Sequence, residues 1–248
     1  MDAFGQRALV DGMSTLQRAQ EAVAHNLANA TSPGFKRRAT FVQAQSFQEL
    51  LGAAQRSDPS LSASLDWQQG DLEPTGERTH LAVEGDGFLV VETPNGQRAL
   101  SRGGQVTFGA DGTLRLLNGA QLIGTNGQPV RVDTSYQLEI GSNGQISQPG
   151  RNGQSDVGSL SIVQHQDRGS LRSIGAGLYE LPNGELDSDL RTAGPSVALR
   201  QGYLERSNVD VMSEMVRMIS VQRGFEASSR ALTTMGQFHE SFASSFDR

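Results

Sequence analysis

The sequence predicts an α+β protein in which long N- and C-terminal helices pair as a coiled coil around a central antiparallel β-rich domain. Two observations lead to this fold class. Apolar residues recur at a four-three spacing near both ends of the chain, which is typical of heptad helices. Between the ends, short apolar runs alternate with Asn-Gly turns, which is typical of antiparallel strands.

The N-terminal helix is expected from about residue 3 to residue 30. Leu9, Met13, Leu16, Val23, Leu27 and Ala30 form its apolar stripe, with Gln20 as the one polar member. A stripe this narrow predicts a seam against another helix rather than a broad face against a sheet. We expect Leu16, Val23 and Leu27 to carry that packing.

The helix is expected to end at the stretch "NATSPGF". Ser32 precedes Pro33, and a residue before proline avoids the α region. Gly34 can take the left-handed conformation that reverses the chain. Asn26 and Asn29 lie three residues apart on one helix face, so their amides either satisfy the last-turn carbonyls or bond to a neighbouring chain.

A short basic run follows the turn. Lys36, Arg37 and Arg38 lie just beyond the carboxyl end of the helix, where the helix dipole favours cations. Two interpretations remain open: a solvated charge run that satisfies the dipole, or salt bridges to another subunit. Lys36 is the only lysine of the chain.

The middle of the chain, from about residue 41 to 200, is expected to be antiparallel β structure, with a short helix early in the connector. Six Asn-Gly pairs suit type I′ hairpin turns, which need two residues with positive φ. Strand-length runs lie between them: "HLAVEGDGFLVVE", "GTLRLL", "YQLEI", "SLSIVQ" and "GLYEL".

The C-terminal helix is expected to follow "QGYLERSN". One seven-residue series contains Val211, Met218, Phe225 and Leu232, and its partner series contains Glu214, Val221 and Met235. Asn208 or Asp210 can cap the start of this helix, and Glu214 suits the positive end of its dipole. We expect Val211, Met218, Val221, Phe225, Leu232 and Met235 to carry helix packing and assembly.

Composition excludes several classes of protein. The formal net charge is −6, and the basic residues are spread along the chain, so no nucleic-acid partner is expected. The chain has no cysteine, no apolar run long enough for a membrane span and no conventional cleaved signal. The four histidines are scattered, and no convergent reactive set is visible, so we expect no catalytic residues, no metal site, no cofactor and no enzymatic activity.

Three stretches together resemble the bacterial flagellar rod and hook family. "HNLANATSPGFKRRATF" is similar to the N-terminal signature of that family, and "QGYLERSNVDVMSEMVRMISVQRGFEASSRALTT" is similar to its C-terminal element. Between them, "GDLEPTGERTHLAVEGDGFLVV" resembles the β element of the family. The three motifs occur in the order of the family and span most of the chain.

The resemblance implies a structural subunit of the flagellar basal-body rod, assembled helically into a tubular drive shaft. It implies a helical inner domain (residues 1–34 and 205–248), a connector (35–69) and a β-rich outer domain (70–204). The short connector favours a proximal over a distal rod subunit. Family-motif residues at the junction, to which inter-subunit contacts are assigned by the resemblance, are Asn26, Leu27, Asn29, Pro33, Gly34, Phe35 and Lys36.

The resemblance also implies partners and a location. The expected partners are copies of the chain, other rod and hook subunits, the flagellar type III export apparatus and the ring bushings around the rod. The expected location is the periplasm-spanning rod, reached without a cleaved signal peptide and without membrane insertion. The rival hypothesis is a soluble β-domain binding module with helical oligomerisation arms, which predicts ordered helices and a closed oligomer.

Overall fold

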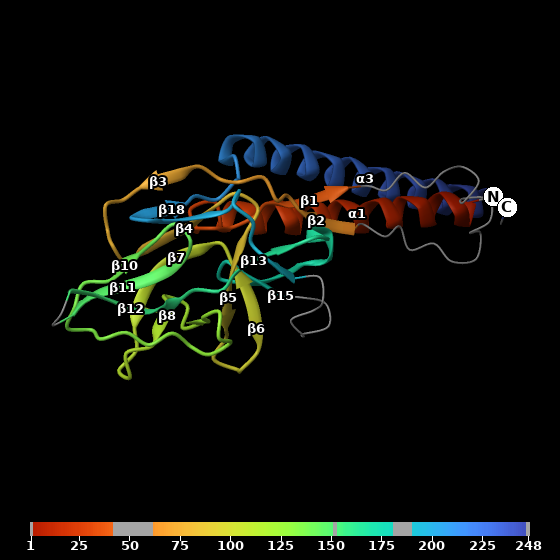
Figure 1. The fold of residues 1–248 in the computed structure, drawn as a ribbon. Coiled ribbons are helices and arrows are strands. Elements are labelled where there is room, and N and C mark those ends of the chain that lie inside the picture. Colours follow the sequence, from red (N-terminus) through yellow and green to blue (C-terminus); the bar gives the residue numbers. More distant parts are fainter. Residues whose placement is uncertain (1, 42–61, 151–152, 181–189, 247–248) are drawn as a thin grey trace. The chain divides into compact units, whose positions relative to one another are not determined.

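A computed structural model describes residues 2–41, 62–150, 153–180 and 190–246. The short helix expected early in the connector falls outside these residues. Two long helices are present among them: α1 (Asp2–Ala28) and α3 (Val211–Phe246) (Figure 1). At 1.5 Å per residue they are about 40 and 54 Å long.

The strands are short, and the pairings among β3 to β18 are antiparallel. The strands are β1 (Arg38–Phe41), β2 (Ser62–Leu65), β3 (Leu72–Pro74), β4 (His80–Glu84), β5 (Phe88–Glu92), β6 (Arg98–Ser101), β7 (Gly103–Phe108), β8 (Leu114–Leu116), β9 (Gln121–Leu122), β10 (Glu139–Ile140), β11 (Gln145–Gly150), β12 (Gly153–Ser159), β13 (Ile162–His165), β14 (Arg172–Gly175), β15 (Leu178–Glu180), β16 (Leu190–Thr192), β17 (Ala198–Gln201) and β18 (Tyr203–Glu205). A short 3-10 turn, η1, covers Arg168–Ser170.

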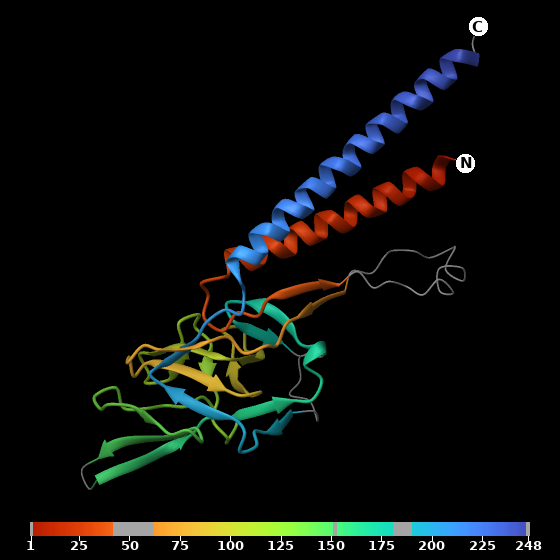
Figure 2. The same ribbon diagram turned by 90° about the horizontal axis from the view of Figure 1, so that it is seen from above.

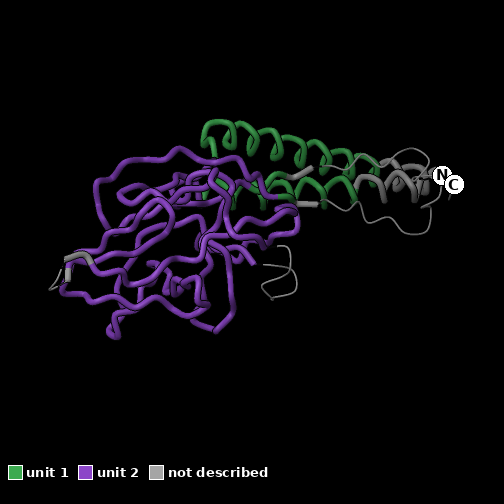
Figure 3. The backbone as a smooth tube through the Cα atoms, in the orientation of Figure 1, with its two compact units in different colours: residues 1–28, 38–64, 209–248 green, residues 29–37, 65–208 purple. Residues whose placement is uncertain are grey.

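The chain divides into two compact units (Figure 3). Unit 1 contains residues 1–28, 38–64 and 209–248, and therefore both long helices and most of the β1–β2 pair. Unit 2 contains residues 29–37 and 65–208, and therefore the other strands. Both units are built from segments that are far apart in the sequence.

Unit 2 is organised around an 11-stranded sheet whose main path runs β14-β15-β6-β5-β9-β8-β7-β4-β17. Strand β5, "FLVVE", alternates its side chains between two buried clusters. Leu89 and Val91 belong to the larger cluster, while Phe88 and Val90 belong to the smaller one with Leu100. This two-sided burial explains why the apolar run of β5 is continuous rather than alternating.

The Asn-Gly pairs at residues 95, 118, 126 and 143 lie in turns as expected, and the pairs at 152 and 183 fall outside the described residues. The expected type I′ geometry is wrong for the four described pairs. Gly96 has a φ of +77°, whereas the described asparagines keep negative φ. The N–H of Gly96 donates to the carbonyl of Thr93 at 2.9 Å, and the N–H of Thr93 donates to the carbonyl of Gln97. These two bonds define a type I turn followed by a left-handed glycine. In several of these turns the asparagine side chain accepts the N–H two residues later, as Asn118 does from Ala120 at 3.1 Å. This bond stabilises the turn while the asparagine keeps a negative φ.

The expected coiled coil of the two helices is also wrong. Leu16 of α1 approaches Gly224 of α3, and Asn26 approaches Glu214, but the helices separate along their length (Figure 2). Gln20, placed on the seam by the spacing, is exposed. Of the described side chains of α3, residues 211–237, only Glu214 is buried.

Side-chain chemistry explains why the two helices separate. A coiled coil needs large apolar side chains inserted at successive seam positions. Here a buried polar pair, Asn26 and Glu214, and a glycine at position 224, which Leu16 approaches, occupy places where the helices meet. Met212 and Val216 of α3 are 70% and 66% exposed.

Candidate functional site

The segment that follows α1 forms a tight turn and then runs into unit 2. The N–H of Ser32 donates to the carbonyl of Asn29 at 3.1 Å, and the Ser32 hydroxyl lies 3.4 Å from the Asn29 side-chain oxygen. The second asparagine of the motif therefore takes part in the turn through its carbonyl and its side-chain oxygen. Pro33 is exposed, whereas Gly34, Phe35 and Lys36 are buried.

Gly34 is bound through both of its backbone groups. It has a φ of +68°, a conformation that glycine adopts without strain. Its N–H donates to the carbonyl of Glu205 at 2.7 Å, and its carbonyl accepts the hydroxyl of Tyr179 at 2.8 Å. These bonds attach the segment 29–37 to two distant parts of unit 2.

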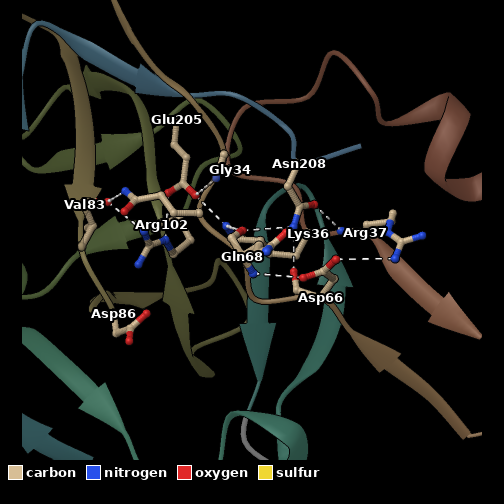
Figure 4. Close-up of polar contacts among 12 residues, drawn as sticks. Gly34, Lys36, Arg37, Asp66, Gln68, Val83, Asp86, Arg102, Glu205 and Asn208 are labelled. Carbon is tan, nitrogen blue, oxygen red and sulfur yellow. Dashed lines mark hydrogen bonds and ion pairs between the residues drawn. The ribbon is translucent and has the colours of Figure 1, made fainter. Parts of the chain in front are cut away.

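A buried charge cluster lies next to this glycine (Figure 4). The Lys36 ammonium donates to Glu205 Oε1 and to the carbonyl of Gln68, both at 2.6 Å. Arg102 Nε donates to the other carboxylate oxygen, Glu205 Oε2, at 2.8 Å. The Gly70 N–H also donates to Glu205 Oε1, at 3.1 Å. One carboxylate therefore serves two buried cations, with side-chain exposures of 1% for Lys36 and Glu205 and 4% for Arg102.

Backbone carbonyls complete the environment of Arg102. Its guanidinium donates to Val83 at 2.8 Å, to Gly85 at 2.7 Å and also to Gly87. It also lies over the ring of Phe88, 5.7 Å from the ring centroid. The arginine thus fixes the loop between β4 and β5 to the end of β18.

Burial changes the acid-base behaviour of this cluster. Desolvation lowers the pKa of Lys36 below its usual value, and the Glu205 carboxylate opposes that shift. Burial also raises the pKa of Tyr179, with the negative charge of Glu205 adding to the effect. Of the three charged side chains, two are cations, so removing the single carboxylate would leave an excess of positive charge in a dry site.

Asn208 joins three backbone segments beside the cluster (Figure 4). Its side-chain oxygen accepts the Arg37 N–H at 2.7 Å, and its amide donates to the carbonyls of Asp66 at 2.8 Å and Gln68 at 3.0 Å. Arg37 and Asp66 also form an ion pair at 3.5 Å. Asn208 therefore does not cap α3. Asp210 does, because its carboxylate accepts from the N–H of Met212 and the hydroxyl of Ser213.

Three aromatic side chains pack next to the charges. Trp67, the single tryptophan, meets Phe88 and Tyr179 edge to face, with ring centroids 5.4 and 4.9 Å apart. Trp67 adjoins Gln68 in the chain, and the Tyr179 hydroxyl bonds to Gly34. Trp67 is thus a natural reporter of whether the segment 29–37 is in place.

Unit 1 has its own buried polar contact. Asn26 is fully buried: its amide donates to the carbonyl of Arg38 at 3.0 Å and to Glu214 Oε2 at 3.3 Å, and its oxygen accepts the Arg38 N–H at 2.8 Å. Neither open interpretation of Asn26, last-turn capping or a bond to another chain, describes these bonds. They connect α1, β1 and α3 within one chain.

The basic run also departs from both interpretations. Lys36 is buried rather than solvated, and the carboxylate that it pairs with, Glu205, belongs to the same chain. Arg37 pairs with Asp66, and the backbone of Arg38 pairs with Asn26. The three adjacent residues thus contribute to three different contacts.

The helix-packing candidates lie at different depths. Val23 is buried; Leu16, Leu27, Met218, Val221, Phe225, Leu232 and Met235 are half-buried; Val211 is 38% exposed. Their assembly role stays a prediction. The structure instead brings Asn26 next to Glu214, and Lys36 next to Glu205.

Sequence reasoning missed Glu205, Arg102 and Glu214 as parts of a site. Glu205 lies inside the quoted "YLERSN", and Glu214 suits the positive end of the helix dipole. The sequence therefore points to both residues but not to the side chains that they bind. Arg102 has no local signal, because its role depends on strands that meet only in the folded unit.

The described residues hold no group of three or more histidine, aspartate or glutamate side chains suited to a metal ion. Neither of the two long helices, within their described extent, is apolar enough to cross a membrane.

Comparison with known proteins gives matches along most of the chain. Three family models match: Flagella basal body rod protein over residues 7–36, Flagellar hook protein FlgE/F/G D1 domain over 82–148, and Flagellar basal body rod FlgEFG protein C-terminal over 200–244. These segments contain, respectively, Lys36, Arg102 and Glu205.

Individual relatives are similar over nearly their full length. The flagellar basal-body rod protein FlgG of Bacillus subtilis is 31% identical over 244 residues, 91% of this chain and 92% of that protein. FlgF of Salmonella typhimurium is 30% identical over 225 residues, 88% of each chain. FlgF of Caulobacter vibrioides is 28% identical over 242 residues, 94% of this chain and 95% of that protein.

Proposed function

This chain belongs to the flagellar basal-body rod protein family, and we propose that it enters the rod through surfaces of its two long helices. It is a structural subunit of the flagellar basal-body rod. Its partners in that role are copies of itself and other rod and hook subunits, as the family suggests.

One observation carries the proposal: α3 leaves large apolar side chains exposed near its start. Met212, Met215, Val216 and Ile219 are 70%, 48%, 66% and 53% exposed. Covering a side chain of this size contributes roughly 1.5–3 kcal/mol. Most of the stability of a helix in a protein comes from packing of its apolar side chains, so contacts with neighbouring subunits would stabilise α3.

The domain roles follow from the same premise. We assign residues 1–34 and 205–248 to a helical inner domain, 35–69 to a connector and 70–204 to a β-rich outer domain. The proximal rod is favoured over the distal rod, because the connector is short. The names FlgG and FlgF both occur among the relatives at similar identity.

Further partners are part of the proposal. An axial subunit has to reach the growing rod, so we propose passage through the flagellar type III export apparatus and a position in the part of the basal body that spans the periplasm. The ring bushings around the rod are proposed neighbours of the outer domain. We propose no catalytic role, in keeping with a structural family.

The test is incorporation into basal bodies. In flagellated cells that carry the chain in place of their own copy, Val216→Asp should reduce the amount of the protein in purified basal bodies at least about tenfold, because it puts a carboxylate into the exposed apolar surface near the start of α3. Val216→Leu is the matched control, since it keeps an apolar side chain at the same position. Normal incorporation of Val216→Asp would refute the role of this helix surface, and absence of the unmodified chain from basal bodies would refute the rod assignment.

A further inference from the structure

Unit 2 contains a polar cavity of about 270 Å³ that the contacts described so far leave unused. Asp86, Gln164, His165, Gln166, Arg168 and Arg191 line it. Every one of these side chains is polar, and Asp86, Gln166 and Arg191 are exposed, so the cavity opens to solvent.

The strands place two arginines at this cavity. Gln164 of β13 lies opposite Arg191 of β16 in the strand register. Arg168 begins the η1 turn shortly after β13, and its Nη1 donates to Asp86 Oδ1 at 2.6 Å. Asp167, the acidic residue next to Arg168, instead accepts the N–H of Gly169 at the start of that turn.

Both guanidiniums keep hydrogen-bonding capacity. A guanidinium carries five N–H groups in a planar fork. Arg168 uses Nη1 for Asp86. With the Gln166 carboxamide assigned so that its oxygen faces the donors, the Arg191 fork meets that single oxygen at 2.7 to 3.1 Å. The lining residues include two arginines and one carboxylate, so the cavity has an excess of positive charge. The chain as a whole has a net charge of −6.

His165 is the one buried side chain among the lining residues. It is only 7% exposed, and its Nδ1 has no hydrogen-bond partner among the described residues. That nitrogen is also closed to solvent, so it does not reach the open part of the cavity. Recognition of an incoming group therefore falls to the two arginines.

We propose that this cavity binds a carboxylate group. Carboxylates match the planar fork of arginine and accept two parallel hydrogen bonds from it. The bond between Arg168 and Asp86 already shows one of these arginines engaged with a carboxylate. The incoming group belongs either to a free small carboxylate or to an acidic side chain of a second copy, and the recognition chemistry is the same for both.

The first experiment titrates the purified chain with sodium acetate, with sodium chloride at matched ionic strength as reference. NMR signals of the arginine Nε–H groups and of the His165 ring report binding. A saturable acetate response that weakens at least about tenfold in Arg168→Gln and in Arg191→Gln supports the site. Arg200→Gln is the control, because Arg200 pairs with Glu84 at 2.7 Å on the surface and does not line the cavity. A response that does not saturate, or that is equal in all variants, overturns the proposal.

A second measurement separates the two sources. Sedimentation equilibrium of the unmodified chain is compared with and without acetate. If the carboxylate comes from a second copy, acetate and Arg191→Gln both shift the chain toward the monomer. If the site takes a free carboxylate, self-association is the same in all conditions while acetate still binds. Acetate binding is measured on the purified chain, and the rod assignment is tested by incorporation into basal bodies. A negative result in one experiment therefore does not decide the other.

Discussion

Lys36 Nζ lies 2.6 Å from Glu205 Oε1, although 169 positions separate the two residues in the chain. The pair joins the first segment of unit 2 to its last. Bringing such distant segments together requires closing a long loop before any contact is gained. The contact therefore depends on the fold of unit 2 as a whole and not on either segment alone.

Removing the carboxylate should destabilise unit 2 strongly. Glu205→Gln leaves Lys36 and Arg102 buried without their anion, and breaking a buried pair in this way costs about 3–5 kcal/mol. Urea unfolding followed by Trp67 fluorescence measures the loss. The control is Glu84→Gln, which removes an exposed ion pair worth about 0–1 kcal/mol. Equal midpoints for the two variants would contradict the structural role of the cluster.

Removing the lysine should be much milder. Lys36→Met leaves the neutral combination of Arg102 and Glu205 in place and keeps most of the buried volume. We expect a loss of about 1–2 kcal/mol from the two lost hydrogen bonds, clearly less than for Glu205→Gln. The same unfolding experiment compares the variants, and a larger effect for Lys36→Met would contradict this balance of charges.

The cluster also predicts how stability depends on pH. Burial lowers the pKa of Lys36 below 10.5, so the unfolded state holds more protons between the two pKa values and the free energy of unfolding rises with pH there. Burial raises the pKa of Tyr179 above 10.0, so the unfolded state loses that proton first and stability falls above this pH.

Unfolding curves across this alkaline range should show a rise followed by a fall. Lys36→Met should lack the rise, and Tyr179→Phe should lack the fall. If both variants follow the unmodified chain, other groups control the alkaline behaviour.

Asn26 should be required for the local order of unit 1. Asn26→Ala removes the bonds to the Arg38 backbone and to Glu214, which leaves buried polar groups unpaired at a cost of about 1–3 kcal/mol. Amide hydrogen exchange should accelerate in residues 20–28 and 211–218. Gln20→Ala, an exposed substitution on the same helix, should leave these rates unchanged. Unchanged exchange in Asn26→Ala would mean that helix contacts alone hold this region.

Two glycines should respond to alanine with opposite signs. A Cβ at Gly70 would lie 1.9 Å from the carbonyl oxygen of Arg206, so Gly70→Ala must displace backbone beside Glu205 and should cost about 1–3 kcal/mol. A Cβ at Gly12 of α1 would meet nothing within 4 Å, and Gly12→Ala should stabilise the helix by about 0.5–1 kcal/mol. Thermal unfolding by circular dichroism compares the two; a neutral Gly70→Ala would contradict the close approach.

Local patterns predict the structure correctly where one segment decides the outcome. The helix ends near Ser32-Pro33-Gly34 because proline and left-handed glycine act on their own neighbours. The runs "HLAVEGDGFLVVE" and "GLYEL" contain β4, β5 and β15 because strand propensity and turns are local. The turn type differs from the expected one because the side-chain bonds of asparagine offer an alternative that the dipeptide alone does not reveal.

The sequence by itself determined the two terminal helices, the antiparallel β region, the turn that ends the first helix and the family. All of these depend on short motifs and local periodicities. Only the tertiary structure decided that Lys36 meets Glu205, that Asn26 meets Glu214 and that the helices separate instead of forming a coiled coil. The physical reason is that burial and charge pairing depend on which distant segments share a site, and no local pattern carries that information.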